Sequence, residues 1–248
     1  HSSWEDTHRE LHEVFNRAAD GKGNILMPAF AVGRTQEILY LFARYYKEWG
    51  LERWHIFLDS PMAIEATRVF TQHADLFDAE TAALWRENGS ESFLPNLHIS
   101  HTPNQSMAIN KIRRGAIIIA GSGMCTGGRI KHHLKHNIWR RECQLLITGF
   151  QARGTTGRAL VDGARRIRLW GETIRVAAQV HTIGGLSAHA DQLALKNWYA
   201  NFKGRPPLTL VHGEEKSIKG LAACLRQELA APVHIARPRE VLELGSER

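Results

Sequence analysis

The hydrophobic pattern at the start of the chain has first the period of a helix and then that of a strand. Over residues 7–23 apolar side chains recur at three- and four-residue spacing and the stretch stops at glycines, so it predicts an amphipathic helix. Its apolar positions are Leu11, Val14, Phe15 and Ala18. The run NILMPAF at 24–30 follows and predicts a short buried strand.

The same alternation continues along the chain. Residues 31–49 predict a helix with Ile38, Phe42, Tyr45 and Trp49 on one face; WHIFLDSP predicts a strand and MAIEATRVFTQH a helix. A strand, a glycine-rich loop and a basic helix are then predicted over GAIIIAGSGMCTGGRIKHHLKH, and a further strand over CQLLITGF. Repeated strand–loop–helix order indicates an α/β fold whose parallel sheet is covered on both faces.

The pattern changes after about Gly157. RRIRLWGETIRVAAQVHTI predicts two strands around a turn at Trp170, Gly171 and Glu172. A helix capped by Ser187 is expected through Leu193 and Trp198. PLTLVHG then predicts a strand, EKSIKGLAACLRQEL a helix, and PVHIAR and EVLEL two short strands. We place a domain boundary near residue 150, which gives domains 1–150 and 151–248.

Composition narrows the class of protein. Of the 248 residues 43% are hydrophobic and 23% charged, which is typical of a globular protein and not of a disordered one. Three cysteines, none at C-x-x-C spacing, argue against a disulfide framework and a cysteine zinc site, and they fit a reducing, cytoplasmic location. No apolar run is long enough for a bilayer, so we expect no membrane partner. The chain opens with His1 in a polar stretch, and we interpret it as a piece of a longer protein.

Positive charge is concentrated in the middle of the chain. Between Lys111 and Arg175 fourteen Lys or Arg residues stand against three acidic ones. One interpretation is a solvated basic face. The other is a surface for a polyanion such as nucleic acid, where phosphate contacts supply most of the affinity.

Three loops join a strand end to a helix start and combine glycine with basic or hydroxyl residues. PAFAVGRTQE carries Arg34, GSGMCTGGR carries Ser122 and Arg129, and GFQARGTTGR carries Arg153 and Arg158. Free N–H groups at such places favour anions, so we expect these residues to contact phosphate. Each loop is alternatively a tight turn with an arginine nearby, and helix capping or an internal ion pair remains open for Arg129 and Arg158. None of the loops matches an ATP-binding P-loop.

Two of the fourteen histidines occupy positions where an α/β sheet displays an active site. His189 stands beside Ser187 and Asp191 at a helix start, and His212 ends an apolar strand before Gly213 and Glu214. Metal binding or proton transfer fits both. His132, His133 and His136 lie on one basic helix; the spacing of His132 and His136 allows a shared metal, but no H-E-x-x-H glutamate is present and a charged face is the favoured interpretation.

Six motifs in order, PAFAVGRTQE, DSPMA, SGMCTGGRI, GFQARGTTGR, GLSAHAD and VHGE, resemble the β-CASP family of metallo-β-lactamase-fold RNA-processing nucleases. The resemblance implies a β-CASP α/β domain followed by the C-terminal half of a metallo-β-lactamase αββα sandwich. It implies that His189 acts as general acid toward the leaving oxygen, that His212 ligates one of two zinc ions, and that Ser187 lies near the scissile phosphate.

The family's main zinc-ligand motif, H-x-H-x-D-H, does not occur in this sequence. We therefore expect the chain to be the C-terminal part of a zinc-dependent ribonuclease, inactive alone and with little or no zinc. Its expected partners are RNA, the N-terminal metallo-β-lactamase half and, as a further candidate, a second copy in a homodimer. The alternative is a non-catalytic RNA-binding protein of the same fold. A third interpretation is an unrelated α/β phosphate-binding enzyme, and the six motifs in order argue against it.

Overall fold

A computed structural model describes residues 3–21, 23–87, 94–187 and 189–242. The described chain forms two compact units, His1–Ser187 and Ala188–Arg248. Among the described residues no helix combines the length and the apolar character needed to cross a bilayer.

The first unit is organised around a six-stranded sheet in the order β3-β2-β4-β1-β5-β8, and every neighbouring pair is parallel. The strands are β1 (Ile25–Pro28), β2 (His55–Leu58), β3 (Leu97–Ile99), β4 (Ala116–Ala120), β5 (Gln144–Ile147) and β8 (Gln179–Thr182). The expected α/β class with a parallel sheet is confirmed. All residues of β1, β4 and β5 are buried, as continuous apolar runs in a sheet covered on both faces should be.

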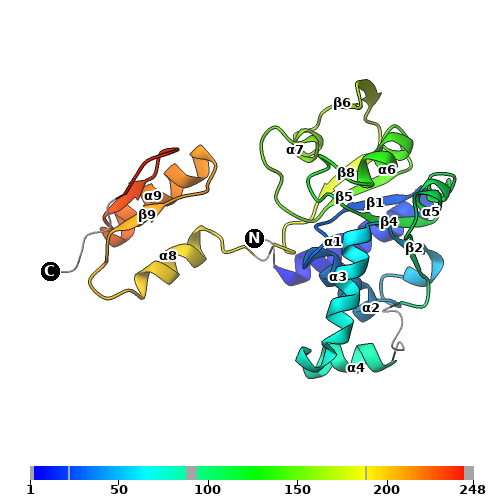
Figure 1. Cartoon of the computed structure of the whole chain (residues 1–248), viewed down its shortest axis with the longest axis horizontal. Coiled ribbons are helices and arrows are strands. Elements are labelled where there is room, and N and C mark those ends of the chain that lie inside the picture. Colours follow the sequence, from blue (N-terminus) through cyan, green and yellow to red (C-terminus); the bar gives the residue numbers. More distant parts are fainter. Residues whose placement is uncertain (1–2, 22, 88–93, 188, 243–248) are drawn as a thin grey trace. The chain divides into compact units, whose positions relative to one another are not determined.

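Helices cover both faces of this sheet (Figure 1). They are α1 (Trp4–Gly21), α2 (Arg34–Arg44), α3 (Pro61–Gln72), α4 (Ala79–Glu87), α5 (Pro103–Ile109), α6 (Ile130–Asn137) and α7 (Thr156–Val161), with short 3₁₀ turns η1 (Leu51–Arg53) and η2 (Ala74–Leu76). Alternate strand residues enter opposite cores. Ile25 and Met27 pack with α1, α2 and α3, whereas Leu26 packs with α5, α6 and α7 on the other face.

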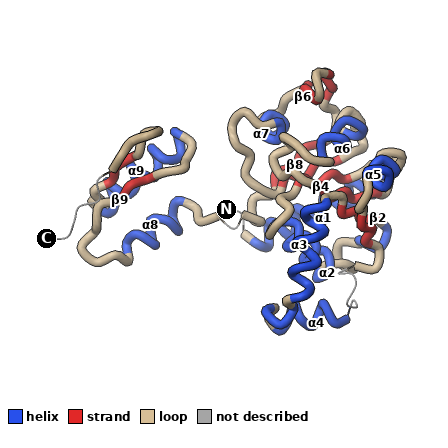
Figure 2. Tube along the Cα trace, in the orientation of Figure 1, coloured by secondary structure: helices blue, strands red, loops and turns tan. Residues whose placement is uncertain are grey.

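Between α7 and β8 lies an antiparallel hairpin of β6 (Arg166–Leu169) and β7 (Glu172–Arg175) (Figure 2). Its position and its turn at Trp170 and Gly171 confirm the predicted pair of strands. The chain then returns to the main sheet, where β8 pairs with β5. Because of this pairing the first compact unit extends to Ser187, whereas the domain boundary near residue 150 stays a prediction.

The second unit is a small α/β arrangement. It contains α8 (Gln192–Ala200), β9 (Leu208–Leu210), α9 (Glu215–Leu229) and β10 (Val233–Ile235), and β9 and β10 are parallel. Tyr199, Leu225 and Ala231 form its buried core. The strands and helices expected at 207–237 are confirmed, but residues 240–242 of the expected last strand are not in a strand and 243–244 lie outside the described residues.

Two local expectations are corrected. The helix expected to reach Trp49 ends at Arg44, although Trp49 is fully buried and stacks on Tyr45 with ring centroids 4.9 Å apart. Helix α8 is capped by Asp191, whose Oδ1 accepts the Ala194 N–H at 2.9 Å. Ser187 lies five residues before the first helical residue, too far along the chain to bond the first-turn amides.

Candidate functional site

The carboxyl ends of the parallel strands bring five of the predicted residues to one edge of the first unit. Arg34 begins the helix after β1, Ser122 follows β4, Arg153 follows β5 and Ser187 follows β8. Arg158 lies in α7, directly after the β5 loop. In parallel α/β sheets this edge is where ligands bind. The order of the six strands thus places loops that are distant in sequence at a common edge of the sheet.

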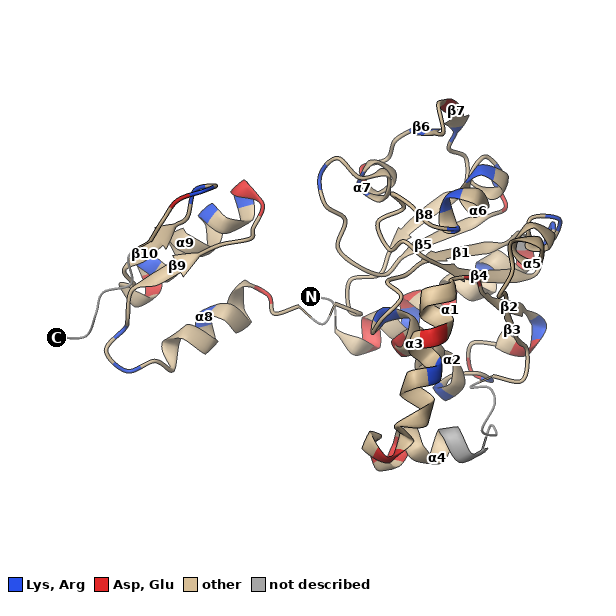
Figure 3. Cartoon of the chain, in the orientation of Figure 1, with Lys and Arg blue, Asp and Glu red and all other residues tan. Residues whose placement is uncertain are grey.

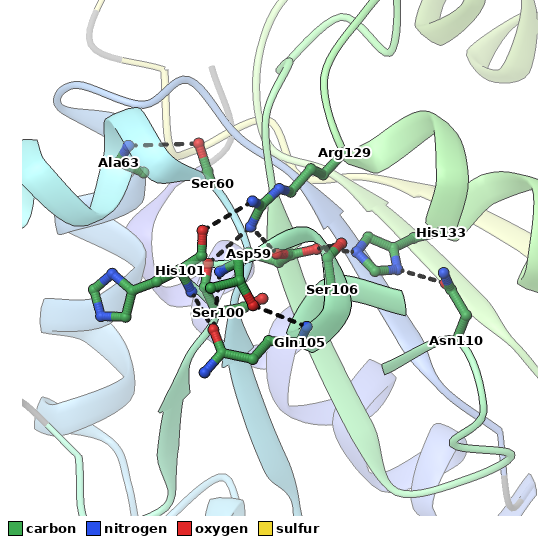
Figure 4. A network of polar contacts seen from close by, with 11 residues as sticks. Asp59, Ser60, Ala63, Ser100, His101, Gln105, Ser106, Asn110, Arg129 and His133 are labelled. Atoms are coloured by element: carbon green, nitrogen blue, oxygen red, sulfur yellow. Dashed lines mark hydrogen bonds and ion pairs between the residues drawn. The ribbon is translucent and has the colours of Figure 1, made fainter. Parts of the chain in front are cut away.

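A buried carboxylate, Asp59, organises the part of this edge formed by β2, β3 and β4 (Figure 4). Asp59 follows β2 and is fully buried. Ser106 Oγ donates to its Oδ2 at 2.6 Å, and His133 Nε2 lies 2.6 Å from the same oxygen. Arg129 Nη1 donates to Oδ1 at 2.7 Å. A buried charge needs such partners, so Asp59 ties α5 and α6 to the end of β2.

These contacts also set the protonation of Asp59. Burial by itself raises the pKa of the carboxyl, but the hydrogen bonds from His133, Ser106 and Arg129 outweigh burial and lower the pKa to about 2. Asp59 is therefore a carboxylate at neutral pH. His133 is itself fixed, because its Nδ1 lies 2.9 Å from Asn110 Oδ1.

Arg129 is held by internal acceptors. Besides Asp59, its guanidinium donates to the carbonyl oxygens of Ser100 at 2.8 Å and His101 at 3.1 Å. Its side chain is 17% exposed. The structure thus gives the internal ion pair that the sequence left open, and a phosphate contact by Arg129 stays a prediction.

The glycine-rich loop after β4 is closed by its own hydroxyl and backbone groups. Ser122 Oγ accepts the N–H groups of Thr126 at 3.1 Å and Gly127 at 3.2 Å. Gly128 has φ +66°, and a Cβ there would overlap the backbone carbonyl of Gly121. Ser122 is therefore a structural acceptor inside the loop, and its contact with phosphate stays a prediction.

The loops after β4 and β5 are joined to each other. Gln151 Nε2 donates to the carbonyl oxygens of Gly123 at 2.9 Å and Gly149 at 3.1 Å, and the Gly157 N–H donates to Met124 at 3.0 Å. Gly123 packs directly on Phe30 of the β1 loop. The three predicted phosphate loops, which follow β1, β4 and β5, are thus in contact with one another at the strand ends.

The other predicted arginines differ in their surroundings. Arg34 pairs with Glu37 at 2.5 Å and is 12% exposed, and Arg158 pairs with Asp162 at 2.8 Å and is 35% exposed. For Arg158 this is again the ion pair that the sequence left open. Arg153 is exposed and Ser187 is half-buried. Phosphate contacts by these four residues stay predictions.

His189 and His212 both belong to the second unit. His189 is exposed and stands two residues before the cap of α8. His212 is exposed, follows the carboxyl end of β9 and has φ +58°. A non-glycine residue in the left-handed region costs about 1–2 kcal/mol, so the turn after β9 holds the backbone of His212 in a strained conformation.

The described residues do not by themselves complete a zinc site. Among them no three His, Cys, Asp or Glu side chains are grouped so that they could hold a metal ion. A catalytic zinc takes three protein ligands, and the role of His212 as one of them stays a prediction. His132 and His136 are both exposed on α6, and no such group includes them.

Sequence reasoning missed the Asp59 network and the part that His133 has in it. His133 is fully buried, whereas His132 and His136 of the same helix are exposed. The signal was present in α6, where Ile130, His133, Leu134 and Asn137 recur at helical spacing and are all buried. DSPMA was recognised as a motif, but nothing in its local pattern names the partners of Asp59.

Two family models match most of the chain. The model described as "Beta-Casp domain" matches residues 35–160. The model described as "Zn-dependent metallo-hydrolase RNA specificity domain" matches residues 173–236, a range that includes His189 and His212.

Relatives of known name match nearly the whole chain. Ribonuclease TTHA0252 of Thermus thermophilus is 36% identical over 226 residues, which cover 91% of this chain and 51% of that protein. Transcription termination factor FttA of Pyrococcus horikoshii is 32% identical and that of Methanocaldococcus jannaschii 31%, each over 90% of this chain and 35–36% of the relative. The chain thus spans about half or less of the length of these relatives.

Proposed function

Because the chain belongs to the β-CASP family of metallo-β-lactamase-fold nucleases, we propose that it is part of a zinc-dependent ribonuclease that hydrolyses RNA phosphodiester bonds. The observation that carries the proposal is the match of residues 173–236 to an RNA specificity domain, with both His189 and His212 inside it. The loop after β5 supports it, because its Arg153 is exposed at the strand ends, where a phosphate backbone can bind.

In this proposal His189 protonates the departing oxygen. An imidazole has an ordinary pKa near neutrality, so it can hold and release a proton under the conditions in which RNA is cut. The exposure of His189 leaves its ring accessible to a substrate. His212 contributes one zinc ligand, and the described residues do not supply the rest. We therefore propose that ligands from a metallo-β-lactamase half complete the site, and that this chain alone is inactive.

The test is RNA cleavage by the full-length protein with single histidines replaced. His189→Ala should lower the cleavage rate of an end-labelled RNA about 100-fold or more while RNA binding is retained, since a general acid contributes about 10²–10⁴-fold. His234→Ala is the matched control, because His234 is an exposed histidine of the same unit. Full activity in His189→Ala would contradict the role of His189.

A second candidate function has its own support. The archaeal relatives are named transcription termination factors, and the described residues lack a complete metal site. A non-catalytic RNA-binding protein would bind the same labelled RNA with no cleavage by the full-length protein at any zinc concentration. That result would replace the ribonuclease proposal with the binding one.

A further inference from the structure

The β6–β7 hairpin lies along helix α6 and is fastened to it by three contacts. Lys135 Nζ pairs with Glu172 at 2.7 Å. Lys131 Nζ stands 4.7 Å from the centroid of the Trp170 ring, and the His132 ring lies 4.5 Å from it. Ile167 and Leu169 anchor the hairpin from beneath, because both are buried in the core that α6 shares. The hairpin therefore has a fixed surface.

The outer face of this hairpin is strongly basic. Residues of β6 alternate between exposed arginine and buried aliphatic side chains, so Arg166 and Arg168 point away from the core. Arg175 of β7 is the cross-strand partner of Arg166. Like charges directly opposite each other destabilise a strand pair. The one acidic residue of the hairpin, Glu172, pairs with Lys135 of α6, and among the described residues no acidic side chain pairs with Arg166 or Arg175. Figure 3 shows the basic residues on α6 and along the hairpin.

The turn of the hairpin also departs from the usual choice of residue. Trp170 and Gly171 form a two-residue turn with φ +48° and +83°. Such a turn favours Asn-Gly or Gly-Gly, and a bulky residue at positive φ is a true outlier. The indole is nevertheless kept there and remains 50% exposed. Backbone strain of this kind clusters at functional sites.

We propose that these residues bind single-stranded RNA. The surface, which we call the hairpin platform, consists of Lys131, His132, Arg166, Arg168, Trp170 and Arg175. An unpaired base stacks on the exposed ring of Trp170, and the arginines contact the phosphates on either side. An exposed aromatic ring beside basic side chains selects unpaired bases, because bases inside a duplex have no free face.

The hairpin platform deepens the proposed function and rests on RNA being the ligand. Lys131 and His132 follow Arg129 by two and three residues at the start of α6. The platform therefore continues from the glycine-rich loop at the strand ends, and it extends the RNA path over the outer side of α6.

The test is RNA binding by the chain 1–248 with Trp170 replaced by Asn. Asn-Gly is the preferred pair for this turn, so Trp170→Asn removes the ring while it favours the hairpin. Fluorescence anisotropy with a labelled oligouridine should show binding weakened about 5- to 150-fold, the range for loss of one stacked base. Trp170→Phe should keep most of the affinity. Trp139→Ala is the matched control, since Trp139 is 49% exposed near the other end of α6 and should leave binding unchanged.

The dependence of RNA affinity on salt concentration distinguishes the contribution of the Trp170 ring from that of the arginines. Arg166→Ala should reduce the slope of log Kd against log salt by about 0.7, the value for one phosphate contact with a single strand. Trp170→Asn should leave this slope unchanged. Lys47→Ala is the control for charge, because Lys47 is an exposed lysine in the turn that follows α2, and α2 packs on the opposite face of the sheet.

Each outcome distinguishes this inference from the proposed function. If the Trp170→Asn variant keeps its hairpin and binds RNA as tightly as the wild type, the hairpin platform does not bind RNA. The ribonuclease proposal would be unaffected by that result. An acidic peptide that displaces the RNA with higher affinity would overturn RNA as the ligand of this surface. Loss of cleavage in His189→Ala together with full binding would support the proposed function independently of Trp170.

Discussion

Asp59 shows how one residue can fix the geometry of a functional edge. Its carboxylate accepts bonds from α5 and from both the start and the middle of α6, and no part of it reaches solvent. A buried ion pair contributes little net stability compared with apolar packing, but removing one partner leaves the others uncompensated. The network therefore specifies position more than it adds stability.

At this scale we expect Asp59→Asn to destabilise the first unit by about 3–5 kcal/mol, since Arg129 and His133 would lose their buried anion. Urea unfolding followed by circular dichroism measures the change. Asp162→Asn removes the exposed carboxylate that pairs with Arg158 and should cost about 0.5 kcal/mol or less. Equal effects of the two substitutions would show that the Asp59 network is not specially stabilising.

The decrease of the unfolding free energy at acidic pH should depend on Asp59. Its pKa is about 2 in the folded protein against an ordinary value of 3.8, so folding favours the carboxylate. Its contribution is complete above about pH 4 and is lost as the pH falls toward about 2. The difference in unfolding free energy between wild type and Asp59→Asn should thus be constant from pH 7 to 5 and shrink below pH 4. A difference that grows on acidification would contradict this.

The sequence could indicate where Asp59 stands but not what it binds. Its partners lie 47, 70 and 74 residues along the chain, and only the packing of three helix and strand ends brings them together. The ion pair of Arg129 could not be predicted from the sequence for the same reason. The sequence places an arginine beside a glycine-rich loop, but it does not indicate which acceptor the guanidinium contacts.

At the scale of elements, the loop after β4 depends on one of its two adjacent glycines. Gly128→Ala places a Cβ against the Gly121 backbone at φ +66°. Strain and overlap together should cost roughly 2–4 kcal/mol. Gly127→Ala meets open space and has no positive φ, so its effect should be within about 0.5 kcal/mol. Thermal unfolding of both variants is the measurement, and equal melting temperatures would contradict the packing of this loop.

Elements with a strong period were predictable, and short or exposed ones were not. Strands β1, β4 and β5 are continuous apolar runs, and α1 buries all four of its predicted positions. Strand β3 has three residues and no buried one, and β8 carries exposed or half-buried polar residues. Both belong to the sheet through pairing with a neighbour, which local pattern does not report.

At the scale of the whole molecule, the ligand inventory leads to a prediction about zinc. The described residues offer no three-ligand group, so the chain 1–248 should retain far less than one zinc ion after dialysis. Plasma mass spectrometry measures the ratio. About two zinc ions per chain, the content of a two-metal site, would mean that residues such as His132 and His136 do form a site and that our account of the ligands is wrong.

The alternation of β6 has a consequence for how this protein can change over generations. Buried Ile167 and Leu169 hold the hairpin, while Arg166 and Arg168, which alternate with them along β6, are exposed. Substitutions at the outer positions therefore alter the surface offered to a ligand at almost no cost to folding. Variants with new ligand preferences can arise at these positions one step at a time, with the scaffold kept intact at each step.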